Sequence, residues 1–185
     1  MRIEGVTNLA TVRKVTRAPI IGFMKVDRPD TPIRITPTVA DVRALIAEGA
    51  SIVAFDATDR PRPDPVEALI EAILHGGAIP MADCALASDG QRMAALGVPV
   101  LGSTLSGYTG GDVPTVPDLA LVTALAGLGR FTIAEGRYQQ PEDAAAAIRA
   151  GADTVVVGSA ITRPEHVTKW FADALHGALV ERQRA

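Results

Sequence analysis

The feature that most constrains the fold of this chain is a repeated unit, in which an apolar, strand-like run is followed by a helix-like segment. The unit recurs at intervals of roughly 20–30 residues, and each run ends in a polar residue or a glycine. Six complete strand signals begin at Ile20, Ser51, Ala78, Val98, Phe131 and Thr154, and a partial one lies at Arg2–Gly5. Strands that alternate with helices in this way form a parallel sheet, because a helix carries the chain back before the next strand begins.

Caps and glycines mark the expected helix boundaries. Thr38 is a typical N-cap residue, and Pro65 is expected to open the next helix. The last segment, Pro164–Leu179, is predicted as an amphipathic helix. Its expected buried stripe consists of Val167, Trp170, Phe171 and Leu175.

Both an open doubly wound sheet and a (β/α)8 barrel satisfy the repeat. Near-equal units and polar residues at almost every strand end favour the barrel, whose active site is built from the carboxyl ends of many strands. If the last strand is the eighth, Arg2–Gly5 is the end of the second. The prediction is a single α/β domain over residues 1–185, a TIM barrel with strands two to eight present. The first strand and helix are expected to be missing, with Met1 not the functional start.

Composition narrows the class of protein. An apolar content of 48% supports one globular domain with a large core, and a net charge of −3 argues against nucleic acid and against an anionic membrane surface. Aromatic residues make up only 4%, too few for base-stacking platforms. No apolar run reaches the ~18 residues of a membrane-spanning helix, and the single cysteine rules out a disulfide framework. The chain is expected to be cytoplasmic and soluble.

The run Thr154–Arg163 predicts a phosphate site. Val155–Val157 suit a buried parallel strand, and the small residues Gly158 and Ser159 let backbone N–H groups approach a ligand. A short helical turn would aim those groups at an anion, and Arg163 adds a positive charge. The alternative is a strand followed by an ordinary glycine turn.

Three charged residues at strand ends are candidates for proton transfer. Lys25 ends an apolar run, and burial at a barrel mouth would lower its pKa and make it a usable acid or base. Glu135 and Asp83 end two other strands and would meet Lys25 across the mouth. The alternatives are a solvated lysine and carboxylates that favour a helix N-terminus. Asp56 ends a further strand, although Asp59, Arg60 and Arg62 beside it are consistent with a loop ion network.

Other reactive residue types are interpreted more simply. Arg2, Arg137 and Arg163 could clamp an anionic substrate, and Arg137 is the one most expected to be a surface arginine. Cys84 is expected to be a buried structural thiol, since it would point away from the mouth if Asp83 points in. His75, His166 and His176 fall within predicted helices and are expected to be solvated or capping. No cluster of His, Cys and carboxylate has metal-ligand spacing, so no metal site is predicted.

Seven segments, in order and over the whole length, resemble the N-acetylmannosamine-6-phosphate 2-epimerases of sialic-acid and amino-sugar catabolism. They are RIEGV, IIGFMKVD, FDATDRPRP, MADC, GSTLSGYT, IAEGRY and VVVGSAITRP. The resemblance implies a phosphate-binding TIM barrel that needs no metal or organic cofactor. It also implies inversion of C2 to give N-acetylglucosamine 6-phosphate, so the expected partner is a small-molecule sugar phosphate.

The resemblance also assigns roles to individual residues. It makes Lys25 and Glu135 catalytic, and it places Asp83, Arg2 and Arg163 at the substrate. The phosphate loop corresponds to Gly136, Gly158 and Ser159. Val26 stands where many members have a second basic residue, and the family's first strand, which carries a substrate-contacting glutamine, has no counterpart here.

Several alternatives stay open from the sequence. Another phosphate-binding barrel, such as a sugar-phosphate isomerase or an indole- or thiazole-forming synthase, is one, and a truncated barrel without turnover is another. A lysine-centred mechanism is not separated from a two-base scheme with Lys25 and Glu135. The apolar terminal helix around Trp170 leaves a homodimer open.

Overall fold

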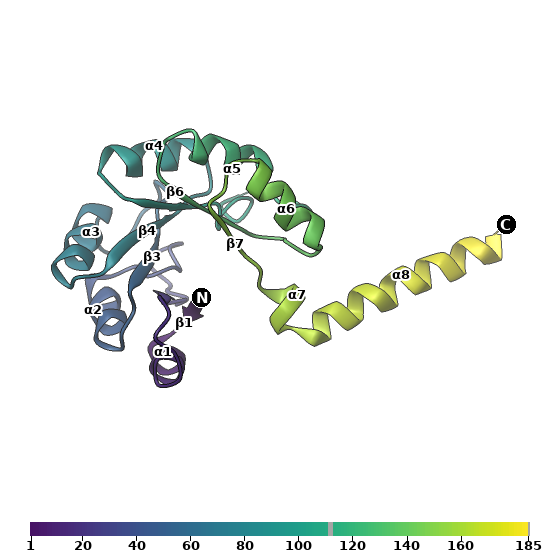
Figure 1. The fold of residues 1–185 in the computed structure, drawn as a ribbon, viewed down its shortest axis with the longest axis horizontal. Helices are drawn as coiled ribbons and strands as arrows, with labels where there is room; N and C mark the ends of the chain where they lie inside the picture. The colour runs from purple at the N-terminus through teal and green to yellow at the C-terminus, as the bar shows by residue number, and fades with distance from the viewer. Residues whose placement is uncertain (111–112, 185) are drawn as a thin grey trace.

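A curled sheet of seven parallel strands forms the centre of the computed structural model, which describes residues 1–110 and 113–184 (Figure 1). The strands lie in chain order across the sheet, so consecutive strands are always neighbours. They are β1 (Arg2–Glu4), β2 (Ile21–Phe23), β3 (Ile52–Asp56), β4 (Ile79–Asp83), β5 (Val100–Gly102), β6 (Phe131–Glu135) and β7 (Thr154–Val156). The predicted α/β class and the parallel sheet are confirmed, and the sheet has the form of part of a barrel.

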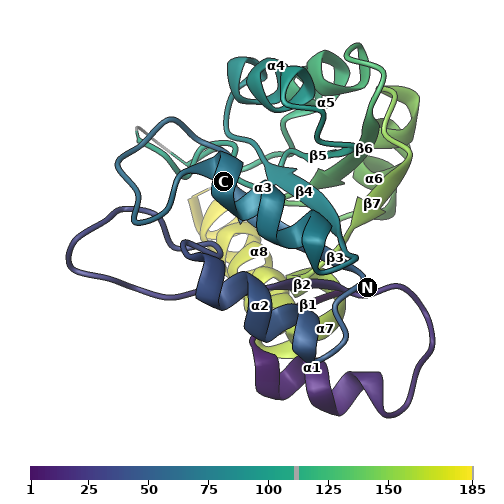
Figure 2. The same ribbon diagram turned by 90° about the vertical axis from the view of Figure 1, so that its left-hand side faces the viewer.

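Six helices connect the strands and cover the outer side of the curled sheet (Figures 1 and 2). They are α1 (Val6–Arg13), α2 (Val39–Ala47), α3 (Val66–His75), α4 (Ala87–Ala95), α5 (Leu119–Ala126) and α6 (Pro141–Arg149). After β7 the chain forms the short helix α7 (Ser159–Thr162) and the long helix α8 (Pro164–Arg184). The helices therefore shield one face of the sheet and leave its inner face for the site.

The two faces of the sheet differ in what they bury. The outer face packs under the helices through residues such as Val53, Phe55, Ala82 and Leu101. The inner face carries a smaller apolar layer of Ile21, Ala54, Met81, Val100 and Ile133. Side chains alternate along a strand, so Asp83 shares the inner face with Met81, and Glu135 shares it with Ile133. The alternation thus sends both predicted carboxylates to the inner face at the carboxyl ends of their strands.

Local signals in the sequence account for two features of the packing. Thr38 caps α2 through a capping box, in which its side chain accepts from the Asp41 N–H and the Asp41 side chain accepts from the Thr38 N–H. Gly22 lets α1 approach β2 closely, since a Cβ there would lie 2.7 Å from Leu9 and 2.9 Å from Ala50. The predicted cap at Thr38 is confirmed, and the helix predicted after Pro65 begins at Val66.

The terminal helix differs from its prediction. Helix α8 extends away from the curled sheet (Figure 1), and its predicted buried stripe is largely exposed, with Phe171 at 69% and Leu175 at 67%. Val167 and Trp170 are partly buried. The amphipathic pattern and the helix are confirmed, but the burial was wrong, because a pattern shows which face is apolar and not what covers it.

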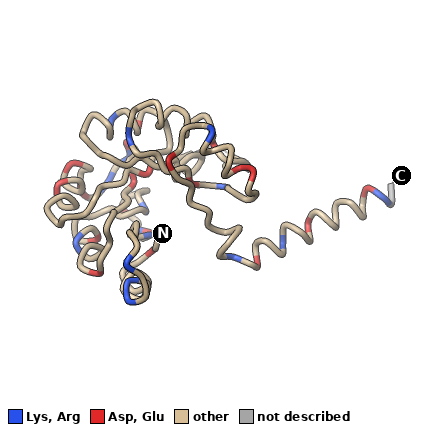
Figure 3. The backbone as a smooth tube through the Cα atoms, in the orientation of Figure 1, with Lys and Arg blue, Asp and Glu red and all other residues tan. Residues whose placement is uncertain are grey.

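The sheet is open within the described residues. Its edge strands, β1 and β7, each pair with one neighbour. Charged residues of both signs are spread over the helices and loops (Figure 3). In the part of the chain that the structure describes, no helix is long and apolar enough to cross a membrane. The predicted loop Gly102–Val113 includes residues 111–112, which lie outside the described residues.

Candidate active site

A buried ion pair joins the first strand to the fourth. Arg2 begins β1 and Asp83 ends β4, and their side chains are 4% and 0% exposed. The guanidinium holds the carboxylate with both terminal nitrogens, at 2.9 Å from Nη1 to Oδ1 and 2.5 Å from Nη2 to Oδ2. This two-point geometry suits arginine and carboxylate, and it fixes the orientation of both groups.

Glu135 and Thr104 complete the cluster. Glu135, at the end of β6, places Oε2 2.9 Å from Arg2 Nη1, and its side chain is 20% exposed. The Thr104 hydroxyl, just beyond β5, donates to Asp83 Oδ1 at 2.8 Å and lies 3.4 Å from Glu135 Oε2. One cation therefore holds two carboxylates, and the Thr104 hydroxyl lies between them.

Burial and charge set the protonation of the cluster. Burial of Arg2 disfavours its charge, but Asp83 and Glu135 outweigh that effect and raise the pKa of the guanidinium, so Arg2 stays charged. Burial raises the pKa of the Glu135 carboxyl, against the lowering effect of Arg2. Glu135 is thus the group in the cluster that takes up a proton more readily than an ordinary glutamate.

Two neighbours shape the space around this cluster. The Arg2 guanidinium lies over the ring of Phe23, 4.6 Å from its centre. Gly102 faces the cluster from β5, where a Cβ would lie 3.2 Å from Thr104 Oγ1 and 3.4 Å from Asp83 Oδ1. The missing side chain leaves room for the hydroxyl and the carboxylate to meet.

Lys25 lies two residues beyond the end of β2, and its side chain is exposed. Its backbone pairs with Ile35, which packs with Phe23 and Leu105 at the same end of the sheet. Among the described residues its ammonium has no hydrogen bond or ion pair. The predicted burial of Lys25 is therefore wrong. Asp83 and Glu135 come together as predicted, but they meet around Arg2 and not around Lys25.

The residues predicted to bind phosphate follow two neighbouring strands. Gly136 comes directly after β6 with φ +110°, and Gly158 and Ser159 begin α7 just after β7. Because Glu135 pairs with Val156, these segments follow adjacent strands at the same end of the sheet, where the strands have their carboxyl ends. Arg163 is exposed and forms an ion pair with Glu165. The structure thus brings the two glycine segments to one edge and leaves Arg163 at the surface.

Comparison with known proteins identifies the family. Residues 1–177 match the family model described as "Putative N-acetylmannosamine-6-phosphate epimerase". The chain belongs to the N-acetylmannosamine-6-phosphate epimerase family. Relatives in Proteus mirabilis (54% identical, covering 95% of this chain and 75% of theirs) and Vibrio vulnificus (55% identical, 94% and 77%) are each named "Putative N-acetylmannosamine-6-phosphate 2-epimerase".

A solved structure extends the family assignment to the fold. The N-acetylmannosamine-6-phosphate 2-epimerase of Clostridium perfringens superposes with a TM-score of 0.90 and is 37% identical, covering 94% of this chain and 77% of that one. The curled parallel sheet with helices outside is therefore the architecture of this epimerase family.

Asp56, at the end of β3, has a local role in this member of the epimerase family. Its carboxylate is 1% exposed and binds Arg60 at 2.6 Å, while Thr58 donates to it from both N–H and hydroxyl. Arg62 donates to the Asp56 carbonyl at 2.9 Å. The loop ion network that the sequence left open is confirmed for Asp56 with Arg60 and Arg62.

The partial burial of Arg137 and the hydroxyl residues of the loop after β5 were not predicted from the sequence. Arg137 is half-buried and donates to backbone carbonyls of that loop, so its expected surface role was wrong. Thr104 and Ser106 were not singled out as site residues, although the segment GSTLSGYT carried them. The missed signal was the presence of three hydroxyl residues directly after a strand, where side chains reach the site.

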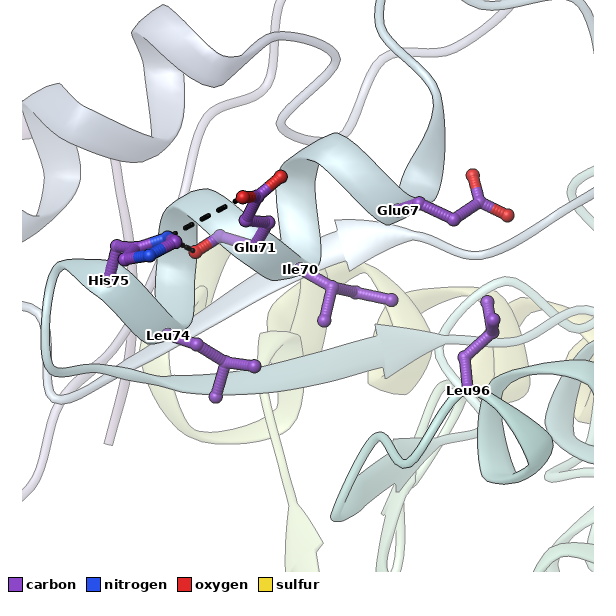
Figure 4. A pocket seen from close by; sticks show the side chains of 6 residues that line it. All are labelled: Glu67, Ile70, Glu71, Leu74, His75 and Leu96. Atoms are coloured by element: carbon purple, nitrogen blue, oxygen red, sulfur yellow. Dashed lines mark hydrogen bonds and ion pairs between the residues drawn. The ribbon is translucent and has the colours of Figure 1, made fainter.

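Cys84 and a hollow on the outer surface lie outside the cluster around Arg2. Cys84 is fully buried among outer-face residues, as predicted, and burial raises the pKa of its thiol. A hollow of about 400 Å³ lies on the outer side between α3 and α4 (Figure 4), lined by Glu67, Ile70, Glu71, Leu74, His75 and Leu96. None of the predicted site residues lines it. Among the described residues, no group of three or more His, Cys, Asp or Glu could hold a metal ion.

Proposed function

We propose that this chain epimerises N-acetylmannosamine 6-phosphate at C2 to give N-acetylglucosamine 6-phosphate. Membership of the epimerase family supports the reaction, and the Clostridium perfringens enzyme supports the fold for it. The observation that carries the proposal is the buried cluster of Arg2, Asp83 and Glu135 at the carboxyl edge of the sheet. Catalytic groups of barrel enzymes gather at this edge.

The chemistry requires an acid or base beside an open-chain sugar. The C2 proton becomes acidic only when C1 is an aldehyde, so the sugar ring opens first. A base then removes the proton from C2 and leaves an enolate, and a proton returns to the opposite face. Phosphate binding far from C2 holds the flexible chain and offsets part of its ordering entropy.

We assign the proton transfers to Lys25 and Glu135. Lys25 lies at the carboxyl end of β2 with no partner for its ammonium among the described residues, so it is available to a substrate. Glu135 lies in the cluster with a raised pKa, which suits a group that gives or receives a proton. Either one lysine carries both transfers with the glutamate assisting, or each residue serves one face.

We assign substrate contacts to Arg2 and Asp83. The Nε–H of Arg2 is buried and has no acceptor among the described residues. A buried donor without a partner is costly, so a substrate oxygen that accepts from it would be stabilised. Asp83, held by the other two guanidinium nitrogens, would accept from a sugar hydroxyl.

We assign the phosphate to Gly136, Gly158, Ser159 and Arg163. Changing Arg163 to alanine is expected to weaken binding of 6-phosphate sugars and to leave unphosphorylated sugars nearly unaffected. A charge-assisted contact contributes about 1.5–3 kcal/mol, which predicts a loss of roughly 10- to 150-fold. Calorimetric titration of N-acetylmannosamine 6-phosphate measures it, with Arg149→Ala on α6 as the control. Equal losses for both kinds of sugar would place the phosphate elsewhere.

The activity itself is tested with N-acetylmannosamine 6-phosphate in deuterium oxide. We expect N-acetylglucosamine 6-phosphate to form with deuterium at C2, because the abstracted proton exchanges with solvent. Conversion to a ketose instead would favour another sugar-phosphate isomerase. Binding without exchange at C2 would favour a barrel without turnover.

We propose that the sheet is a (β/α)8 barrel with one strand position between β1 and β7, since both edges are unpaired within the described residues. A solved structure with a strand in that position would support this.

The net charge of −3 and a sugar-phosphate substrate support a cytoplasmic enzyme without nucleic-acid partners. The exposed apolar residues of α8 support a homodimer, which light scattering would detect.

A further inference from the structure

We infer that Arg137 is a positioning residue for Glu135, and that it acts by joining Ser106 to Val116 in the segments that follow β5 and precede α5. The inference rests on the proposed function, since it assigns Glu135 a part in proton transfer. Arg137 lies two residues after Glu135, but the hydrogen bonds of its guanidinium do not go to the carboxyl groups of the cluster. Its side chain turns instead to the loop.

The guanidinium of Arg137 joins the two arms of that loop. Nη1 donates to the Ser106 carbonyl at 2.8 Å, and Nη2 lies 3.3 Å from the Ser106 hydroxyl. Nε donates to the Val116 carbonyl at 2.8 Å. Ser106 belongs to the outgoing arm and Val116 to the returning arm, so one planar group fixes the separation of both.

The backbone of Arg137 supports this interpretation. Its φ is +63°, in the left-handed region that costs a residue with a side chain free energy. Such a conformation persists where surrounding contacts hold it in place. Here the three donated bonds to Ser106 and Val116 are those contacts.

The outgoing arm is also bound to Glu135 directly. The Ser103 hydroxyl accepts from the Glu135 N–H and donates to the Glu135 carbonyl, both at 3.0 Å. Thr104, the next residue, places its hydroxyl between Asp83 and Glu135. Ser103 and Thr104 therefore hold the backbone and the carboxylate of Glu135, and Arg137 holds the segment that follows them.

The far end of the loop is anchored in a helix. The Ser106 hydroxyl donates to Asp118 Oδ2 at 2.6 Å, and Asp118 caps α5 by accepting from the Leu121 N–H at 2.9 Å. The ring of Tyr108 lies over the Arg137 guanidinium at 5.7 Å. Without Arg137 the arms lose their shared donor, and the Thr104 hydroxyl is then free to move from its place between the carboxylates.

A loosened Thr104 has a consequence for the charge of Glu135. The groups that face this carboxyl are Arg2 from β1, Asp83 from β4 and Thr104 from the loop. Burial raises the Glu135 pKa most, Arg2 lowers it, Asp83 raises it, and the hydrogen bond from Thr104, 3.4 Å from Oε2, lowers it. Loss of that hydrogen bond is expected to raise the Glu135 pKa and to shift the corresponding limb of the rate profile to higher pH.

The test compares Arg137→Gln and Arg137→Lys with Arg130→Gln. Arg130 lies just before β6 and donates to the Ala94 carbonyl at 3.0 Å, so it is a backbone-binding arginine at the opposite end of the same strand. We expect kcat to fall about 10- to 100-fold in both Arg137 variants with KM changed much less, since a displaced catalytic group lowers the chemical step. Lysine keeps the charge but lacks the planar fork, so it should not restore the rate.

Hydrogen exchange of the unliganded protein provides a readout independent of turnover. Amides of residues 103–108 should exchange faster in both Arg137 variants than in the unchanged protein or in Arg130→Gln. Full rescue by lysine, or unchanged kcat and pH profile in a folded Arg137→Gln, would overturn the inference. Absence of epimerase activity in the unchanged protein would instead overturn the proposed function, whatever the exchange of the loop.

Discussion

Lys25→Ala is expected to lose epimerisation and C2 hydron exchange while the protein still binds N-acetylmannosamine 6-phosphate. Proton transfer by a placed side chain contributes roughly 10²–10⁴-fold. Lys25 is exposed, so its removal should leave the thermal melting temperature nearly unchanged. Single-turnover kinetics and calorimetric titration measure the chemical step and the binding separately.

The control for this variant is Lys14→Ala, which removes an exposed lysine just after α1. A near-normal rate in Lys25→Ala would rule out Lys25 as the base. Glu135→Gln then separates the two schemes. If Lys25 carries both transfers, this variant slows exchange and inversion together, whereas a two-base scheme predicts that exchange at one face continues after inversion has stopped.

Arg2→Met is expected to destabilise the fold by about 3–5 kcal/mol, the cost typical of removing one partner of a buried ion pair. Arg2 is 4% exposed and holds two carboxylates, so the variant leaves Asp83 fully buried and Glu135 mostly buried without their cation. Equilibrium unfolding in urea measures the change. Arg34→Met is the matched control, because Arg34 pairs with Asp27 at the surface and exposed pairs contribute about 0–1 kcal/mol.

The destabilisation in Arg2→Met should depend on pH. Burial raises the folded-state pKa of Glu135 above its ordinary value of 4.5, so the folded state binds this proton more tightly than the unfolded state does. The stability that results is fully present below pH 4.5 and is lost as pH rises through the folded-state pKa. Without Arg2 that pKa rises further, so the variant should be closer to the unchanged protein at pH 5 than at pH 8. A difference that stays constant over this range would contradict the assignment of the cluster.

The shape of the surface alone does not locate the functional site, as the hollow between α3 and α4 illustrates. It is a concave surface with Ile70, Leu74 and Leu96 beside Glu67 and Glu71. Yet the residues that line it belong to the helix side of the sheet, on α3 and just after α4, and none of them belongs to the Arg2 cluster (Figure 4). The site that we propose lies instead at the buried, paired charges around Arg2, on the inner face of the sheet.

Local patterns in the sequence were sufficient for the class of fold. The order of strands and helices follows from alternating apolar runs and caps, and such signals depend on neighbouring residues only. The same patterns placed Asp83 and Glu135 at strand ends, and the pleat then sends both to one face. The sequence also carried the family, since its seven segments match in order and residues 1–177 fit the family model.

Only the tertiary structure decided which side chains meet. Arg2 and Asp83 are 81 residues apart, and their contact depends on how far the sheet curls from β1 to β4. Likewise, Arg137 reaches Ser106 across 31 residues because β5 and β6 are neighbours. The exposure of Phe171 on α8 and of Lys25 beyond β2 could likewise not be predicted from the sequence. Periodicity determines which face of a segment is apolar, whereas burial and ion pairing depend on surfaces that distant parts of the chain supply.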